Sequence, residues 1–196
     1  MPTFNQIRAF LSQKTIGIAG AGGLGSNCAE SLLRCGAGKL IIADYDRVSD
    51  ANLNRQFYFH DQIGEKKVEA LRDNLLRINP FASLQMHFAK VTPENIELLF
   101  STCDVVVEAF DVAYEKMMLI DEMSTQLPHI PVVAASGLAG WGEAEKLKVL
   151  KCGNLVICGD ESSEVSDECP PLAPKVRIVS NLQADVVLEI LLSEFK

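Results

Sequence analysis

The chain has 196 residues, of which 48% are hydrophobic, and it carries a formal net charge of -8 at pH 7. This length and composition suffice to bury one good core and are too short for two full domains, so we expect a single domain over residues 1–196. The acidic balance argues against a broad basic surface for nucleic acid, and the sequence shows neither a signal-peptide pattern nor an apolar run of membrane-spanning length.

The six cysteines indicate reduced thiols rather than a disulfide framework, and we expect a cytoplasmic protein. Cys28, Cys35 and Cys103 fall in or beside apolar stretches, where a core position is the default. Cys158 and Cys169 flank an acidic segment and are the only plausible nucleophiles. Neither lies in a motif that assigns it a role in sulfur transfer.

Residues 15–44 read as a strand, a tight glycine loop, a helix and a second strand. The loop contains four glycines: Gly20, Gly22, Gly23 and Gly25. They let the backbone turn sharply and let a phosphate approach, while the first amides of the helix point N–H groups at that anion. Asp44 ends the second strand roughly 20 residues past the loop, a distance suited to hydrogen bonds from a ribose. The motif predicts a nucleotide site without saying which nucleotide.

Residues 45–56 are polar and irregular, whereas an ordinary dinucleotide fold has a connection of a few residues at this place. A longer loop dense in Asp, Asn, Arg and Gln is a functional candidate. Its candidate residues are Asp46, Asn52, Arg55 and Gln56.

Apolar periodicity predicts the remaining elements. We expect helices over residues 4–13, 26–35, 64–78, 93–100, 113–126 and 175–195. We expect strands over residues 83–88, 104–107 and 131–135, and a hairpin from 143–150 and 155–158. Residues 159–174 are acidic and proline-bearing without periodicity, so a mobile loop is expected there. Together the elements predict an α/β fold: a Rossmann-like, doubly wound, mostly parallel sheet with a C-terminal antiparallel hairpin and a terminal helix.

Four ordered blocks carry a family resemblance: residues 20–26, 44–46, 52–56 and 64–67. Together they resemble the ubiquitin-activating-enzyme-like superfamily (ThiF/MoeB/HesA), and most closely the bacterial ThiF proteins, which adenylate the sulfur carrier ThiS in thiamine biosynthesis. Further blocks extend the resemblance over most of the chain: residues 79–81, 108–111, 133–137 and 172–176.

The resemblance implies acyl-adenylate formation, in which the C-terminal glycine carboxylate of a ubiquitin-like carrier attacks the α-phosphate of ATP. The transition state accumulates negative charge, so the site needs cations and oriented donors. Arg55, Lys67 and Asp111 are the implied catalytic residues. Arg55 would reach the phosphates, Lys67 would neutralise the β- and γ-phosphates, and Asp111 would hold Mg²⁺.

The resemblance also implies binding roles within the glycine loop and the polar loop. Gly23 would lie against the nucleotide and Asp44 would hold the ribose, while Asn52 and Gln56 would reach the phosphates. Asp46 or Glu108 would assist through water. A homodimer and a carrier ending in Gly-Gly are the partners implied, with no membrane and no nucleic acid.

Other interpretations stay open for the same residues. Glycine loops followed by an acid occur in NAD-binding proteins, so an NAD-binding oxidoreductase or redox sensor is one alternative. Others are adenylation of another carrier, such as the small subunit of molybdopterin synthase, a tRNA dehydratase of the same superfamily, and a noncatalytic binder of a ubiquitin-like partner. Each catalytic candidate also has a structural alternative. Arg55 could be a solvated surface charge, Lys67 could be a charge on a helix face, and Asp111 could be the N-cap of the following helix.

The chain departs from the longer family members in its cysteines. Those members have paired Cys-x-x-Cys motifs that hold zinc, whereas Cys152, Cys158 and Cys169 have no such spacing, so no zinc is expected. Ala51 and Val112 also replace a serine and an asparagine of the family pattern.

Overall fold

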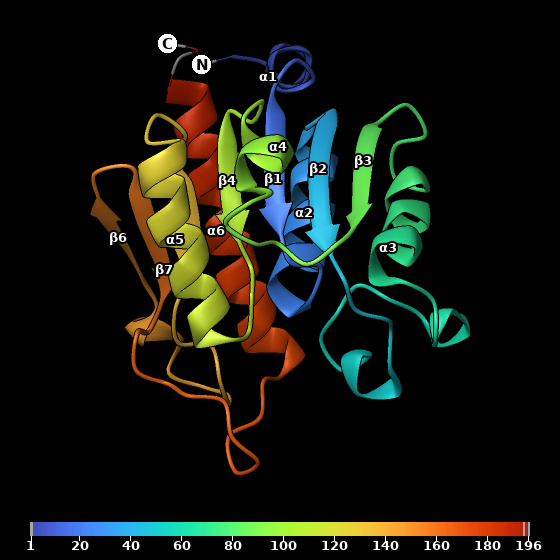
Figure 1. Ribbon diagram of the computed structural model, residues 1–196. Helices are drawn as coiled ribbons and strands as arrows, with labels where there is room; N and C mark the ends of the chain where they lie inside the picture. The colour runs from blue at the N-terminus through green and yellow to red at the C-terminus, as the bar shows by residue number, and fades with distance from the viewer. Residues whose placement is uncertain (1, 194, 196) are drawn as a thin grey trace.

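The computed structural model describes residues 2–193 and 195, and it contains one seven-stranded sheet in the order β3-β2-β1-β4-β5-β7-β6 (Figure 1). The strands are β1 (Thr15–Ala19), β2 (Lys39–Asp44), β3 (Ser83–Phe88), β4 (Val105–Glu108), β5 (Val132–Ala135), β6 (Lys148–Cys152) and β7 (Leu155–Gly159). All pairings are parallel except that between β6 and β7. The predicted doubly wound sheet with an antiparallel end is therefore confirmed.

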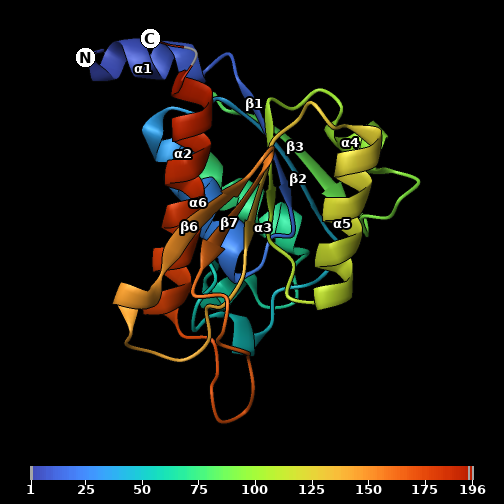
Figure 2. The same ribbon diagram turned by 90° about the vertical axis from the view of Figure 1, so that its left-hand side faces the viewer.

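Helices cover both faces of the sheet (Figure 2). They are α1 (Phe4–Leu11), α2 (Gly23–Cys35), α3 (Lys67–Leu76), α4 (Ile96–Phe100), α5 (Ala113–Gln126) and α6 (Ala173–Ser193). One apolar cluster joins the sheet to α2, α3 and α6, and a second joins it to α4 and α5. β4 and β5 are buried along their whole length, as expected for parallel strands covered on both sides.

Four helices begin at a different residue from the one expected: α2, α3, α4 and α6. α2 begins at Gly23, inside the glycine loop. α3 begins at Lys67 rather than at residue 64, because Arg47 and Lys66 form an isolated β-bridge and the Lys67 N–H donates to the Asp46 carbonyl. α4 begins at Ile96, since the Asn95 side chain accepts from the Thr92 N–H and holds the preceding residues in a turn.

The ends of the chain and the hairpin also differ in their bounds from the expectation. α1 ends at Leu11, and the predicted helix over 175–195 begins earlier, at Ala173, while residue 194 lies outside the described residues. β6 begins at Lys148, because residues 144–146 form a short 3-10 turn (η3, Ala144–Lys146) after Glu143, whose φ is 53°. Among the described residues, no helix has both the length and the apolar character needed to cross a membrane.

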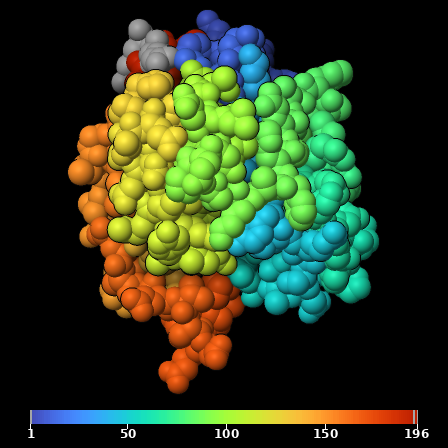
Figure 3. All heavy atoms as spheres, in the orientation of Figure 1, coloured from blue at the N-terminus to red at the C-terminus, as the bar shows by residue number. Residues whose placement is uncertain are grey.

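The parallel strands end together at the lower edge of the sheet in Figure 1, and α1 lies at the opposite edge. The segment after β7 projects beyond the lower edge, as Figure 3 also shows. Because ligands of open α/β sheets bind beyond the carboxyl ends of the strands, the candidate site is expected at this lower edge.

Candidate functional site

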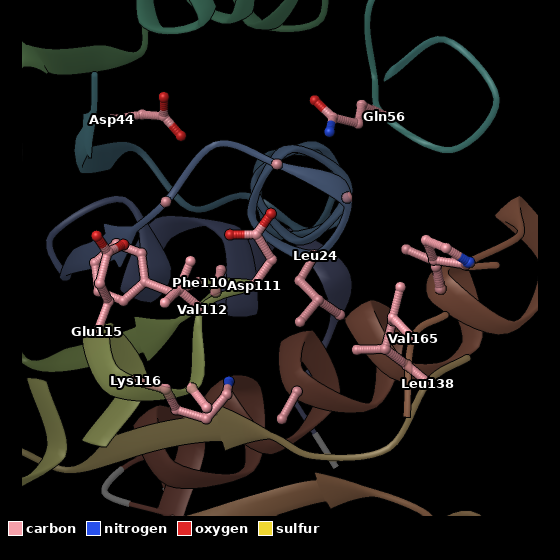
Figure 4. A pocket seen from close by; sticks show the side chains of 18 of the residues that line it. Leu24, Asp44, Gln56, Phe110, Asp111, Val112, Glu115, Lys116, Leu138 and Val165 are labelled. Carbon is pink, nitrogen blue, oxygen red and sulfur yellow. The ribbon is translucent and has the colours of Figure 1, made fainter. Parts of the chain in front are cut away.

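A cavity of about 770 Å³ lies at the carboxyl ends of β1, β2, β4 and β5. Its lining includes most of the candidate residues: Gly20, Gly22, Gly23, Asp44, Asp46, Arg55, Gln56, Lys67 and Asp111. Figure 4 shows Asp44 and Gln56 along one side of the cavity, Glu115 and Lys116 along another, and the Asp111 carboxylate between them. Segments separated by almost 100 residues thus meet at one place, at a size typical of small-ligand sites.

Two buried polar residues after the glycine loop tie the polar loop to the start of α2. The Asn27 amide donates to the carbonyls of Gly23 and Arg55 at 2.6 and 2.8 Å. The Ser26 hydroxyl donates to the Gly22 carbonyl at 2.6 Å and accepts from the Phe57 N–H at 3.0 Å. These bonds place Arg55 beside the glycines. Two adjacent polar residues in the first turn of a buried helix are the sequence signal for this contact, which the expected site residues did not include.

Asp44 is held against the glycine loop by backbone donors. Its carboxylate oxygens accept from the Ala21 and Asp46 N–H groups, each at 2.7 Å. Burial raises the pKa of the Asp44 carboxyl above its usual value, although Lys67 and both backbone donors act in the opposite direction. Hydroxyl donors from a ribose would therefore stabilise a carboxylate that is already fixed in place.

Lys67 is almost fully buried at the first position of α3, and its ammonium lies 2.7 Å from the Asp46 carboxylate. Asp46 is half exposed, so the pair is open toward the cavity that both residues line. The Tyr58 hydroxyl lies 2.7 Å from the Ala21 carbonyl and 3.3 Å from the Lys67 carbonyl, which ties the start of α3 to the glycine loop.

Arg55 and Gln56 bring a cation and an amide to the same wall. The Arg55 guanidinium donates to the Ala51 carbonyl at 3.0 Å and to the Asn54 side chain at 2.8 Å. Gln56 is 6% exposed, and its Oε1 atom is buried without a hydrogen-bond partner among the described residues. An unpaired buried acceptor on a cavity wall favours a ligand that brings a donor.

Asp111 is exposed in the cavity and does not cap a helix. The N-cap of α5 is Val112, which makes no side-chain cap bond, so the N-cap interpretation of Asp111 is wrong. The described part of the chain has no group of three or more His, Cys, Asp and Glu side chains that would hold a metal by itself. A single free carboxylate suits Mg²⁺ that is completed by phosphate oxygens and water, and Asp111 fits that role.

Glu108 lies at the end of β4 and is completely buried. It accepts from the Phe110 N–H at 2.8 Å and pairs with the ammonium of Lys116, which lines the cavity. Burial raises the pKa of Glu108 even though Lys116 favours its charged form. The pair fixes the turn that carries Asp111.

Three of the predicted site residues do not line the cavity: Gly25, Asn52 and Glu108. A Cβ on Gly25 would lie 1.9 Å from the Gly20 carbonyl oxygen, so this glycine allows close packing within the loop. The Asn52 side chain accepts from the Ser49 N–H at 2.9 Å and closes the 3-10 turn η1 (Asp50–Asn52). Residue type and spacing in the sequence do not distinguish a residue that packs locally from one that contacts a ligand.

The segment after β7 is fixed to the cavity rim at its first residue. Asp160 accepts from the N–H groups of Ser162 and Ser163 at 2.9 and 2.7 Å, and its other oxygen lies 2.8 Å from the ammonium of Lys175. Burial alone would raise the pKa of Asp160, but these donors outweigh it and hold the pKa well below its usual value. Ser163 and two following residues thereby reach the cavity. The predicted mobility of residues 159–174 stays a prediction.

The thiols are placed differently from one another. Cys158 is fully buried in β7, and burial, with a smaller contribution from Asp185, raises the pKa of its thiol to about 11. Cys169 is partly exposed, and a Cβ on Gly140 would lie 2.8 Å from its sulfur. Burial therefore keeps Cys158 in the less reactive thiol form at neutral pH.

Known proteins resemble this chain in sequence and in fold. The model of the ThiF family matches residues 5–195. Ubiquitin-like modifier-activating enzyme 5 of Caenorhabditis elegans is 49% identical over 82 residues, which are 42% of this chain and 20% of that protein. The enzyme of the same name from Drosophila pseudoobscura pseudoobscura is 45% identical over 93 residues, which are 47% of this chain and 23% of that protein. The chain thus matches only about a fifth of the length of these relatives.

Solved structures share the fold at low sequence identity. Escherichia coli tRNA N6-threonylcarbamoyladenosine dehydratase, TcdA, in complex with ATP has a TM-score of 0.87 and 20% identity, and the match covers 96% of this chain and 90% of that chain. E. coli MccB with MccA has a TM-score of 0.74 and 18% identity, with 95% and 58% covered. The family model covers nearly the whole chain and the resemblance of its motifs is borne out, so the chain belongs to the ThiF family.

Proposed function

We propose that the protein catalyses the ATP-dependent adenylylation of the C-terminal glycine of a ubiquitin-like sulfur carrier of the ThiS type, in thiamine biosynthesis. The observation that carries the proposal is that Gly23, Arg55, Lys67 and Asp111 line one cavity although they come from four separate segments. Phosphate-binding amides, two cations and a free carboxylate are the groups that a nucleoside triphosphate requires.

The names of the similar proteins support an activating enzyme that uses ATP. The curated relatives are ubiquitin-like modifier-activating enzymes, and a TcdA structure of the same fold is a complex with ATP. The blocks that carry the ThiF resemblance support a sulfur carrier as the substrate. Pairing of two copies of the chain as a homodimer belongs to the same proposal.

In the proposed reaction, a carboxylate oxygen of the carrier forms a bond to the α-phosphorus. The bond from that phosphorus to the bridging oxygen breaks, and pyrophosphate leaves with the electron pair. Arg55 and Lys67 stabilise the negative charge that grows on the phosphates, with no need for a proton shuttle. Asp111 would hold Mg²⁺, which neutralises phosphate charge when bound.

Carrier-dependent ATP–pyrophosphate exchange tests the proposal. Labelled pyrophosphate should enter ATP only when a carrier with an intact Gly-Gly terminus is present, and a carrier lacking its last glycine is the matched control. A folded protein that binds ATP but shows no exchange with any Gly-Gly carrier would contradict adenylylation. Tighter binding of NADH than of ATP with Mg²⁺ would instead favour the oxidoreductase alternative.

A further inference from the structure

Three side chains outside the predicted site meet at one end of the cavity. Tyr45 follows β2, Lys90 follows β3, and Glu115 lies in the first turn of α5. The Lys90 ammonium lies 2.7 Å from a carboxylate oxygen of Glu115 and 5.4 Å from the centroid of the Tyr45 ring. The Tyr45 hydroxyl lies 3.5 Å from the same oxygen. The contact joins the segments after β2 and β3 to the first turn of α5.

The direction of a bound nucleotide follows from the rest of the cavity. Its phosphates belong at Gly22 and Gly23 and its ribose at Asp44, so its base lies beyond Asp44, away from the glycine loop. Figure 4 shows Asp44 and Glu115 at the same end of the cavity, and Leu138 and Val165 at the other. The lining includes three small apolar residues from β2 and the segment after β3: Ala43, Ala89 and Val91. Small apolar side chains leave room for a purine ring to lie against them.

We propose that Lys90 and Glu115, supported by Tyr45, form a latch that closes the base end of the cavity and holds the nucleotide base against these small residues. The inference rests on the proposed function only in taking ATP as the ligand. Lys90 and Glu115 are positioning residues, because they fix the segments that line the base end of the cavity and do not contact the reacting phosphate.

The surroundings of the latch favour a persistent ion pair. The Glu115 side chain is only 11% exposed, while that of Lys90 is 54% exposed. The hydrogen bond to Glu115 raises the pKa of Lys90, which favours the charged form of the lysine. Figure 3 shows the segment after β3 on the front of the molecule, next to the segment after β2, in agreement with the contact between Lys90 and Tyr45. The pair is therefore placed to hold the segment after β3 against the start of α5.

Binding measurements without carrier test the latch, with ATP and inorganic tripolyphosphate as probes. Lys90→Met and Glu115→Gln should each weaken ATP binding by about three- to fivefold, and the double variant should be no weaker than either single one. Tripolyphosphate has no base, so its affinity should stay unchanged. The charge-swapped Lys90→Glu/Glu115→Lys variant should recover ATP affinity.

Lys151→Met is the matched control, since it breaks the exposed Lys151–Glu189 pair of 2.6 Å away from the cavity lining. It should leave both affinities unchanged. Unchanged ATP affinity in Lys90→Met and Glu115→Gln, or an equal loss for tripolyphosphate, would overturn the latch. Failure of carrier-dependent exchange in a protein that binds ATP would count against the proposed function alone.

Discussion

The ammonium of Lys67 is held 2.7 Å from the carboxylate of Asp46, with the lysine side chain 7% and the aspartate side chain 52% exposed. This pairing holds a nearly buried cation at the wall of the cavity before any phosphate arrives. The adjacent lysine behaves differently, because Lys66 pairs with Glu69 on the surface at 2.9 Å. Of these two neighbouring residues, Lys67 is therefore a cation of the site and Lys66 is a surface charge.

Lys67→Met should lower carrier-dependent exchange by about 100-fold or more, because one preorganised charge on the phosphates is lost. Lys66→Met is the control, and its exchange rate should match that of the unmodified protein. Asp46→Asn should have an intermediate effect, since it releases the ammonium without removing it. Equal activity of the Lys67→Met and Lys66→Met variants would contradict this assignment.

Asp111→Asn should raise the Mg²⁺ concentration needed for half-maximal exchange by about tenfold, because a neutral amide is a poorer ligand for a hard cation. The melting temperature should not change, since Val112 and not Asp111 is the N-cap of α5. A magnesium titration of the exchange rate, paired with thermal unfolding, measures both effects. A large fall in melting temperature with an unchanged magnesium requirement would point to a structural role.

Gly22 and Gly25 are expected to respond differently to a methyl group. Gly25→Ala would place a Cβ 1.9 Å from the Gly20 carbonyl oxygen and should cost about 3 kcal/mol of stability. Gly22→Ala would place its Cβ 3.8 Å from the Gln56 amide and should leave the fold intact. Because Gly22 lines the cavity, that methyl group should weaken ATP binding by about tenfold. Urea unfolding and ATP titration of both variants check the distinction, and a stable Gly25→Ala protein would contradict it.

Lys175→Met should destabilise the fold at pH 7 by about 2 kcal/mol, because the buried Asp160 carboxylate keeps only its hydroxyl and backbone donors. Since donors hold the pKa of Asp160 below its usual value, its charged form stabilises the native state at neutral pH. That contribution is lost as the pH falls through the lowered pKa, so the difference between the two proteins should shrink below about pH 4.

Urea unfolding at several pH values measures this difference. Lys148→Met is the control, because it breaks the more exposed Lys148–Glu161 pair of 2.6 Å in the same region and should cost less than about 1 kcal/mol. A difference between Lys175→Met and the unmodified protein that stays constant into acid would contradict the role of the Asp160 charge.

The order of strands and helices could be predicted because it follows from the local periodicity of apolar residues. The glycine loop and Asp44 together predicted that the site lies at the carboxyl edge of the sheet. Boundaries set by distant contacts could not be predicted. α3 begins at Lys67 because a bond to Asp46 fixes its first turn, and local periodicity carries no sign of that bond.

The same limit applies to the site. Gly25 and Asn52 match the pattern of ligand-binding residues, yet one allows close backbone packing and the other closes a turn. The Lys90–Glu115 pair joins residues 25 positions apart whose neighbourhood exists only after β3 and α5 have packed. The sequence therefore predicts the charged residues of the site better than the residues that fix the shape of the cavity.

Intact-mass measurement of the carrier tests the central claim most directly. After incubation with ATP and Mg²⁺, a carrier ending in Gly-Gly should gain the mass of one AMP group in the presence of this protein. It should gain none when the last glycine is removed, and the gain should be about 100-fold slower or more with the Lys67→Met variant. If the folded protein binds ATP and the mass of every Gly-Gly carrier tested stays unchanged, the adenylyltransferase account is contradicted.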